Sequence, residues 1–209
     1  MEIAKAAGQR WHIITLFDGA VPNDTLQEAM RDPRARKVLI DAYRPLIKRF
    51  GAAAIDTEPV VFDLVNEIHN LGGVTERQRQ QFIEALIEAF IQDAPGATLT
   101  LGIYDYDDLA YWLYLFPKYA HQPVRLIVTF HRYEPFQELP AAWDFNVPEG
   151  TDIGITEADP RHDLSGQVAL AAAKGYRWLL FWQDHDYPYD PLAHRQAIDH
   201  AQAAAQTGP

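Results

Sequence analysis

Two glutamates stand where apolar, strand-like stretches of the sequence end. Glu67 follows Val-Val-Phe-Asp-Leu-Val-Asn, and Glu157 follows Asp-Ile-Gly-Ile-Thr. A pair of carboxyl groups facing one another is what cleavage of a glycosidic bond requires: one protonates the leaving oxygen, and the other attacks the sugar or activates water. A single glutamate at such a place is more often a loop carboxylate or a helix cap. The pair, with Asn66 before Glu67 and with His131 and Tyr133 two residues apart, favours chemistry.

The elements that must position these residues alternate between short β-branched or aromatic runs and longer amphipathic ones. The strand-like runs are nearly continuous in apolar residues, which is typical of parallel strands buried on both faces. They are Trp11–Phe17, Val60–Val65, Ala97–Ile103, Val124–Phe130, Thr151–Thr156 and Tyr176–Trp182.

Helices are predicted between these runs from apolar spacing and capping residues. The stretch beginning at Thr75 opens with Thr-Glu-Arg-Gln, which spells a capping box, and Gly175 is the expected residue after a helix end. The predicted helices are Arg34–Phe50, Thr75–Asp93, Asp107–Tyr119, Asp163–Lys174 and a last one from Asp190. Residues 134–149 form a proline-containing loop, and no linker divides the chain, so residues 1–209 are read as one domain.

Alternating strands and helices fit either an open doubly wound sheet or a (β/α)8 barrel. A glycine-rich G-x-G-x-x-G turn for a dinucleotide is absent from the sequence. Nearly every strand-like run instead ends in polar side chains, and barrel enzymes assemble their active sites from such residues. The predicted fold is therefore α/β, of the (β/α)8 barrel type. The residues at these ends are Asp18, Asn66, Glu67, Tyr104, Asp105, His131, Tyr133, Glu157, Gln183, Asp184 and His185.

Composition narrows the function further. The chain has 209 residues, a formal net charge of −11 and no cysteine. Its one serine, Ser165, lies outside any G-x-S-x-G elbow, so neither thiolate nor serine-hydrolase chemistry is expected. The acidic balance argues against a nucleic-acid partner, and no apolar run approaches the length of a membrane helix. The first residues lack the hydrophobic core of a signal peptide, and both secreted and cytoplasmic locations stay open.

The motifs together resemble a known family. Val61–His69 resembles the fourth-strand signature of clan A glycoside hydrolases, especially the cellulase family (family five), in which Asn-Glu-Pro is usual. Phe130-His-Arg-Tyr133 is similar to that family's sixth-strand His-x-Tyr, and Gly154-Ile-Thr-Glu157 to its seventh-strand nucleophile segment. Tyr176–Trp182 resembles its eighth strand. The order of the four motifs agrees over residues 59–182.

This resemblance implies a retaining double displacement on β-linked saccharides without a metal or another cofactor. Glu67 would be the general acid/base and Glu157 the nucleophile, with their carboxyl groups about 5–5.5 Å apart. Asn66 would bind the sugar 2-hydroxyl, and His131 and Tyr133 would orient the nucleophile. Trp182 would stack on a sugar ring, with Asp18 and His69 in supporting roles.

The sequence also departs from the family. Ile68 replaces the usual proline after Asn-Glu. On this resemblance, we expect the chain to contain about six βα units, strands three to eight, without the first two strands of the barrel. Six units cannot close a barrel, which predicts open sheet edges at Trp11–Phe17 and Tyr176–Trp182 and self-association through them.

Two other functions stay open. The chain could be a saccharide-binding remnant that keeps the motifs without turnover. It could also be a metal-dependent barrel hydrolase that uses histidines and aspartates at strand ends, among them His162, Asp163 and Asp184–Asp186. Chelator-insensitive activity would argue against the metal enzyme, and binding without hydrolysis would favour the remnant.

Overall fold

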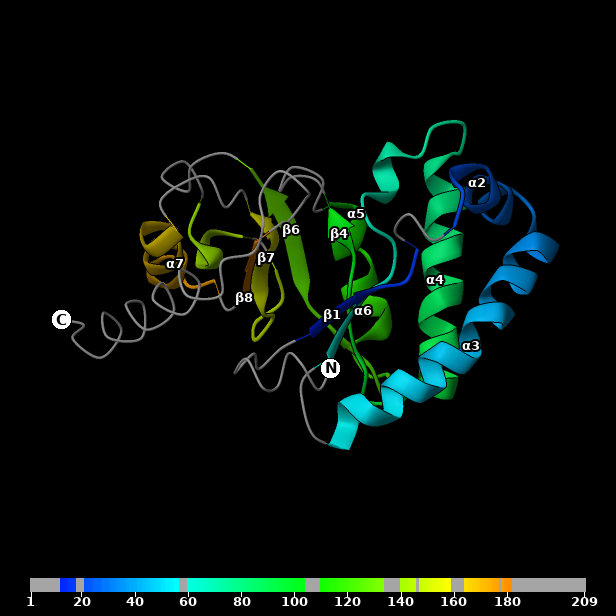
Figure 1. The fold of residues 1–209 in the computed structure, drawn as a ribbon, viewed down its shortest axis with the longest axis horizontal. Coiled ribbons are helices and arrows are strands. Elements are labelled where there is room, and N and C mark those ends of the chain that lie inside the picture. Colours follow the sequence, from blue (N-terminus) through cyan, green and yellow to red (C-terminus); the bar gives the residue numbers. More distant parts are fainter. Residues whose placement is uncertain are drawn as a thin grey trace. The chain divides into compact units, whose positions relative to one another are not determined.

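The protein is described from a computed structural model, shown in Figure 1. It describes residues 12–17, 21–56, 60–103, 110–133, 140–145, 147–158, 164–176 and 178–181. These residues form two compact units. Unit 1 contains the described residues up to Ile103 together with 110–127, and unit 2 contains those from Val128 onward.

Unit 1 is built on a parallel sheet with the strand order β1-β2-β3-β5. Each strand is hydrogen-bonded to the next in parallel, as in Ile13 opposite Val61 and Val61 opposite Thr98. All residues of β2 are buried, which matches the apolar run that predicted it. The strands of unit 1 are β1 (His12–Thr15), β2 (Val60–Asp63), β3 (Thr98–Thr100), β4 (Gly102–Ile103) and β5 (Arg125–Leu126).

Three helices lie together on one side of unit 1 in Figure 1: α2 (Asn23–Arg31), α3 (Pro33–Asp56) and α4 (Glu76–Asp93). The core forms where α4 packs on the sheet, and the ring centroids of Phe62 in β2 and Phe90 in α4 lie 4.8 Å apart. Burial of such aromatic side chains is the main stabilising contribution to a fold of this kind. The remaining helices of unit 1 are η1 (Ile68–Asn70), α5 (Ala110–Leu113) and α6 (Leu115–Tyr119).

The start of α4 confirms the predicted capping box. The Gln78 backbone N–H donates to the Thr75 hydroxyl at 3.3 Å, and the Thr75 N–H donates to the Gln78 side chain at 2.8 Å. Two of the four N–H groups that a helix start leaves without partners are stabilised in this way, which fixes the residue at which α4 begins.

Helix α2 was not predicted, although its signal is present in the sequence. Leu26, Ala29 and Met30 are buried at the i, i+3, i+4 spacing of an amphipathic helix. The basic segment 31–37 after it, expected to be the solvated start of a helix, has a second role. Arg36 donates to the carbonyls of Ala29 and Met30 at 3.1 and 2.7 Å and so caps the end of α2.

Unit 2 contains β6 (Val128–Arg132), β7 (Ile153–Ala158) and β8 (Trp178–Phe181), joined in that order by parallel pairing. Two helices accompany them, η4 (Ala142–Asp144) in the predicted loop and α7 (Leu164–Ala173). Helix α7 ends as predicted, since Gly175 follows it with a φ of 82° that glycine adopts readily. Aromatic packing of Phe130 against Phe145 and Tyr176, with both centroid distances 5.8 Å, fills the space beside β6.

Each described strand overlaps one of the six predicted runs, and β6 and β7 extend two residues beyond the predicted ends, to Arg132 and Ala158. Two of these runs are each divided into two strands, at Leu101 between β3 and β4 and at Ile127 between β5 and β6. Helix α3 extends beyond the predicted Phe50 to Asp56 through an alanine-rich stretch of high helix propensity. The segment predicted as one helix over 107–119 contains the two short helices α5 and α6. The final helix predicted from Asp190 lies outside the described residues.

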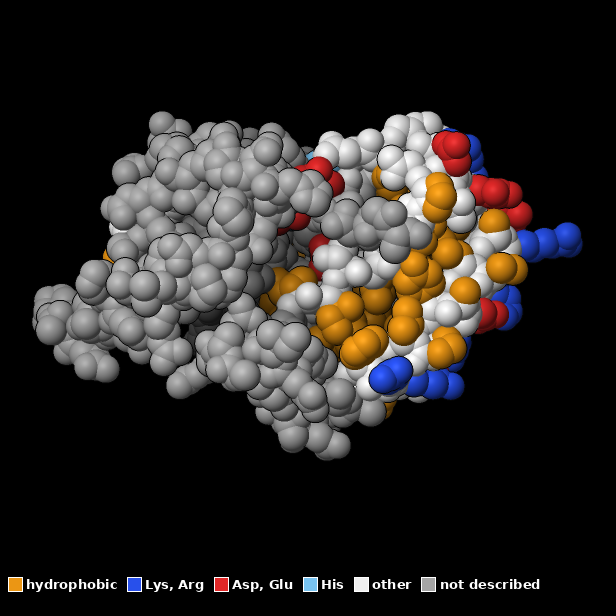
Figure 2. Space-filling model, in the orientation of Figure 1, with side chains coloured by type: hydrophobic (Ala, Val, Ile, Leu, Met, Phe, Trp, Pro, Cys, Tyr) orange, Lys and Arg blue, Asp and Glu red, His pale blue; other side chains and the backbone are white. Residues whose placement is uncertain are grey.

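Figure 2 shows charged side chains gathered along the α2 and α3 side of unit 1, next to hydrophobic ones. Val38 and Leu46 of α3 are the large hydrophobic side chains exposed in the described part of the chain, at 71% and 44%. Among the described helices, none combines the length and the apolar character needed to cross a membrane.

Candidate active site

Asn66 and Glu67 lie in the turn that follows the buried strand β2 in unit 1, which ends at Asp63. The sheet continues for one residue past the strand, because the Leu64 N–H donates to the Thr100 carbonyl at 2.9 Å. The chain then turns, and Asn66 and Glu67 are both half-buried. The predicted position of Glu67, at the carboxyl end of a parallel strand, is therefore the observed one.

The backbone of Glu67 has an unusual conformation. Its φ of 46° and ψ of 45° lie in the left-handed region, and it is the one non-glycine residue with positive φ in the described part of the chain. Such a conformation costs about 1–3 kcal/mol and persists only where the surroundings determine it. The Glu67 N–H donates to the Gly102 carbonyl at 2.6 Å, and the Asn70 N–H donates to the Glu67 carbonyl at 2.9 Å.

The side chain of Glu67 is also held locally. Asn70 Nδ2 donates to Glu67 Oε2 at 2.7 Å, which orients the carboxyl group from the 3-10 helix η1. Ile68, which stands where the resembling family has proline, is fully buried. A proline there would disfavour the left-handed conformation of the residue before it, so this departure from the family accompanies the observed backbone of Glu67.

Asp63, the last residue of β2, was not among the site residues predicted from the sequence. Its side chain is buried and accepts a hydrogen bond from the Gly102 N–H at 2.7 Å. The signal was present, because an aspartate inside the apolar run Val60–Val65 must find a hydrogen-bond donor if it is buried there.

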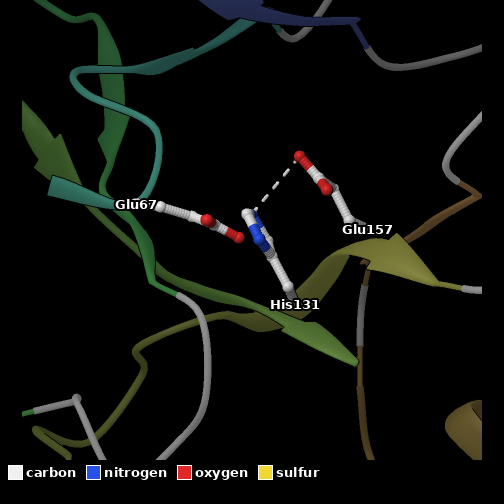
Figure 3. Close-up of side chains that lie close together, drawn as sticks. All are labelled: Glu67, His131 and Glu157. Carbon is white, nitrogen blue, oxygen red and sulfur yellow. Dashed lines mark ion pairs between the residues drawn. The ribbon is translucent and has the colours of Figure 1, made fainter. Parts of the chain in front are cut away.

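Glu157 of unit 2 lies near the end of β7, and both of its carboxyl oxygens have neighbours. The Tyr133 hydroxyl donates a hydrogen bond to Oε2. His131 Nε2 lies 3.6 Å from Oε1, the ion pair drawn as a dashed line in Figure 3. The His131 side chain is 1% exposed and that of Glu157 is 20% exposed, so the histidine is fixed while the carboxylate keeps access to solvent. The contact of Tyr133 with Glu157 was expected from the sequence.

A β-bulge brings Glu157 opposite His131. Phe130 of β6 pairs with Ile155 of β7, whereas the next residue, His131, pairs with Glu157. The pairing of β7 with β8 also shifts in register over this stretch of β7, between Ile155 and Ala158. One extra residue in β7 turns the following side chains, as bulges next to active sites commonly do.

The other predicted site residues are placed as follows. His69 lies in η1, half-buried, two residues after Glu67. Asp18 and Trp182 lie outside the described residues, as do His162, Asp163 and the Asp184–Asp186 group of the metal-dependent alternative. The structure thus describes Asn66, Glu67 and His69 in unit 1, and His131, Tyr133 and Glu157 in unit 2.

Neither a family model nor a curated protein matches the sequence. Solved structures do match. A tri-modular GH5 (subfamily 4) endo-beta-1,4-glucanase from Bacillus licheniformis aligns over 92% of this chain, at 14% identity and a TM-score of 0.52. The catalytic domain of Thermobifida fusca endoglucanase Cel5A aligns over 96%, at 13% identity and a TM-score of 0.54. The fold of the chain is similar to that of family-five cellulases.

A variant of the same Thermobifida endoglucanase in complex with cellotetraose aligns over 88% of this chain, at 14% identity and a TM-score of 0.50. In the order given, the chain spans 43%, 72% and 60% of these three structures. The prediction of an α/β fold of the barrel type, with the family-five cellulases as its structural neighbours, is confirmed.

Proposed function

We propose that this protein is a retaining O-glycosyl hydrolase that cleaves β-linked saccharides, with Glu157 as nucleophile and Glu67 as general acid/base. The observation that carries the proposal is the environment of Glu157, a partly exposed carboxylate with Tyr133 hydrogen-bonded to one oxygen and His131 beside the other. Glu67 supports it, since its backbone is constrained at the end of β2 and its carboxyl group is oriented by Asn70.

In the first step, one carboxylate oxygen of Glu157 attacks the anomeric carbon as the glycosidic bond breaks. Glu67 gives its proton to the leaving oxygen, and a glycosyl ester of Glu157 forms. In the second step, Glu67 takes a proton from water, whose oxygen attacks the same carbon and releases Glu157. The overall reaction consumes one water and retains the anomeric configuration.

The remaining residues have supporting roles in this proposal. Asn66 donates to the 2-hydroxyl of the sugar in the glycosyl intermediate, where such bonds strengthen in the transition state. Tyr133 and His131 hold the nucleophile in its attacking orientation. Trp182 stacks on a sugar ring, and Asp18 and His69 line the site.

The substrate class is proposed from the neighbours' names. One of the three structures is named an endo-beta-1,4-glucanase, the other two are of one endoglucanase, and one of these two is a complex with cellotetraose. Cellooligosaccharides are therefore the first substrates to test. A saccharide is the expected partner, and self-association through open sheet edges remains a prediction.

The test is hydrolysis of cellotetraose and of dinitrophenyl β-cellobioside by the wild-type chain and three variants. Glu157→Ala is expected to abolish turnover of both. Glu67→Ala is expected to lose cellotetraose hydrolysis, to keep part of its activity on the aryl glycoside, whose leaving group needs little protonation, and to gain glycosyl azide formation with added azide.

The matched control is Glu149→Ala, which removes an exposed loop carboxylate of unit 2 and should change neither rate. Cellotetraose binding without turnover by the wild type would replace the proposal with the saccharide-binding alternative. Loss of wild-type activity on chelation would replace it with the metal-dependent one.

A further inference from the structure

Asp63 is a buried carboxylate at the last residue of β2, and its burial requires explanation. Only 4% of its surface is exposed. Removing a carboxylate from water is costly unless hydrogen bonds replace the lost hydration. Gly102, the first residue of β4, provides such a bond through its N–H, 2.7 Å from Asp63 Oδ1. The carboxylate therefore serves the backbone at the point where the regular pairing of β2 ends.

Gly102 links Asp63 to Glu67. Its N–H donates to Asp63, and its carbonyl accepts the Glu67 N–H at 2.6 Å. The N–H of Gly102 is thus bonded to Asp63, and its carbonyl is bonded to Glu67. A displacement of Gly102 would therefore move the carbonyl that accepts the hydrogen bond from the Glu67 N–H.

Position 102 also has no room for a side chain. A Cβ atom built on Gly102 would lie 2.6 Å from Asp63 Oδ2 and 2.8 Å from Asn66 Oδ1, distances that real Cβ contacts essentially never show. The side chains of Asp63 and Asn66 therefore both pack on the bare α-carbon of Gly102. The same glycine sets the position of Asn66, the residue proposed to bind the sugar 2-hydroxyl.

Glu67 needs this support because its backbone lies in the left-handed region, at φ 46°. That conformation is unfavourable for an L-residue and must be maintained by its hydrogen bonds. The bond to Gly102 is one of them, and Gly102 is itself held by Asp63.

We infer that Asp63 is a positioning residue for Glu67, the proposed general acid/base. Asp63 acts through Gly102 to fix Glu67 and Asn66. This inference rests on the proposed function for its effect on catalysis, whereas the link from Asp63 to Glu67 does not depend on it. The two are therefore tested by separate readouts.

The first readout is hydrogen exchange of the backbone amides, followed by NMR. Asp63→Val removes the acceptor, and exchange at both Gly102 and Glu67 is expected to accelerate about tenfold, as loss of one buried hydrogen bond implies. Asp63→Asn keeps an oxygen for the Gly102 N–H and is expected to exchange nearly like the wild type. Thr100→Val, which removes the buried 3.3 Å hydrogen bond to the carbonyl of Ile127, between β5 and β6, is the matched control and should leave Glu67 unchanged.

A second pair of variants tests the same link without removing the carboxylate. Gly102→Ala forces Asp63 and Asn66 away and is expected to accelerate exchange at Glu67. Gly72→Ala adds the same methyl group where nothing lies within 4 Å, and it should have no such effect. This pair decides the inference if Asp63→Val does not fold.

The second readout is the ratio of kcat/KM values on cellotetraose and on dinitrophenyl β-cellobioside. If Asp63 positions the acid, Asp63→Val lowers cellotetraose hydrolysis at least about tenfold more than aryl cellobioside hydrolysis, because only the poor leaving group needs the proton. A role in stability alone lowers both rates equally. Unchanged exchange at Glu67 in Asp63→Val and Gly102→Ala, or an equal loss on both substrates, overturns the inference. A wild type inactive on both substrates overturns the proposed function instead, while the exchange data still decide the link to Glu67.

Discussion

The hydrogen bond between Tyr133 and Glu157 can be measured as a coupling free energy. Tyr133→Phe removes one oxygen and keeps the ring, so the packing of the half-buried side chain is preserved. The variant removes the donor to Glu157 Oε2, while His131 stays beside Oε1. Glu157→Ala removes the acceptor, and the double variant removes both. The four proteins make a cycle in which all effects other than the interaction cancel.

The expected magnitude follows from the exposure of Glu157. A hydrogen bond to a charged group contributes about 1.5–3 kcal/mol to stability. Since 20% of the Glu157 side chain is exposed, water partly replaces the lost donor, and the lower end, about 1.5 kcal/mol, is expected. In thermal unfolding of a chain of this size, that coupling corresponds to about 3–6 °C in Tm.

The assay is urea and thermal unfolding of the four proteins at pH 7. Tyr176→Phe combined with Glu157→Ala is the matched control, because the Tyr176 hydroxyl donates to the Pro140 carbonyl at 2.7 Å and should not couple to Glu157. A Tyr133–Glu157 coupling below about 0.3 kcal/mol, the ordinary error of additivity, would refute the reasoning.

Three further predictions concern the stability of the fold. Burial raises the pKa of Tyr119, so the folded protein keeps the proton of this hydroxyl to a higher pH than the unfolded protein does. Tm should therefore fall as pH rises above about 10, and it should fall less in Tyr119→Phe. Arg36→Ala should lower Tm by about 2–4 °C or more, because it removes the two hydrogen bonds that cap the C-terminal end of α2. Lys37→Ala, which removes only an exposed ion pair, should leave Tm within about 1 °C. Ile68→Pro should lower Tm by more than about 4 °C, because it removes a buried side chain and disfavours the left-handed Glu67; an unchanged or raised Tm would show that this conformation is not required.

The elements of the fold were largely predictable because their signals are local. The buried strand β2 is a continuous apolar run, and the capping box at Thr75 is spelled in four consecutive residues. Helix α2 was missed because it is short and its apolar residues, Leu26, Ala29 and Met30, are few. The bulge in β7 has no such local signal, since it depends on the register with both neighbouring strands.

The candidate site was predictable in part. Tyr133 and His131 were expected beside Glu157, and both are found there. The role of Asp63 was not predicted, because it depends on the close approach of Gly102, which follows Asp63 by 39 residues in the chain. The left-handed backbone of Glu67 likewise depends on its hydrogen bond to the carbonyl of Gly102 in β4. Contacts that join distant segments are the part of a site that residue types and spacing do not reveal.

The central claim, that Glu157 is the nucleophile of a retaining glycosidase, is tested most directly by trapping its glycosyl ester. The measurement is incubation of the chain with dinitrophenyl 2-deoxy-2-fluoro-β-cellobioside, followed by mass spectrometry of the intact protein and of its peptides. We expect one fluoroglycosyl group per chain, attached to Glu157 and absent from Glu157→Ala. A label on another residue, or release of dinitrophenol with no covalent label, would contradict the account.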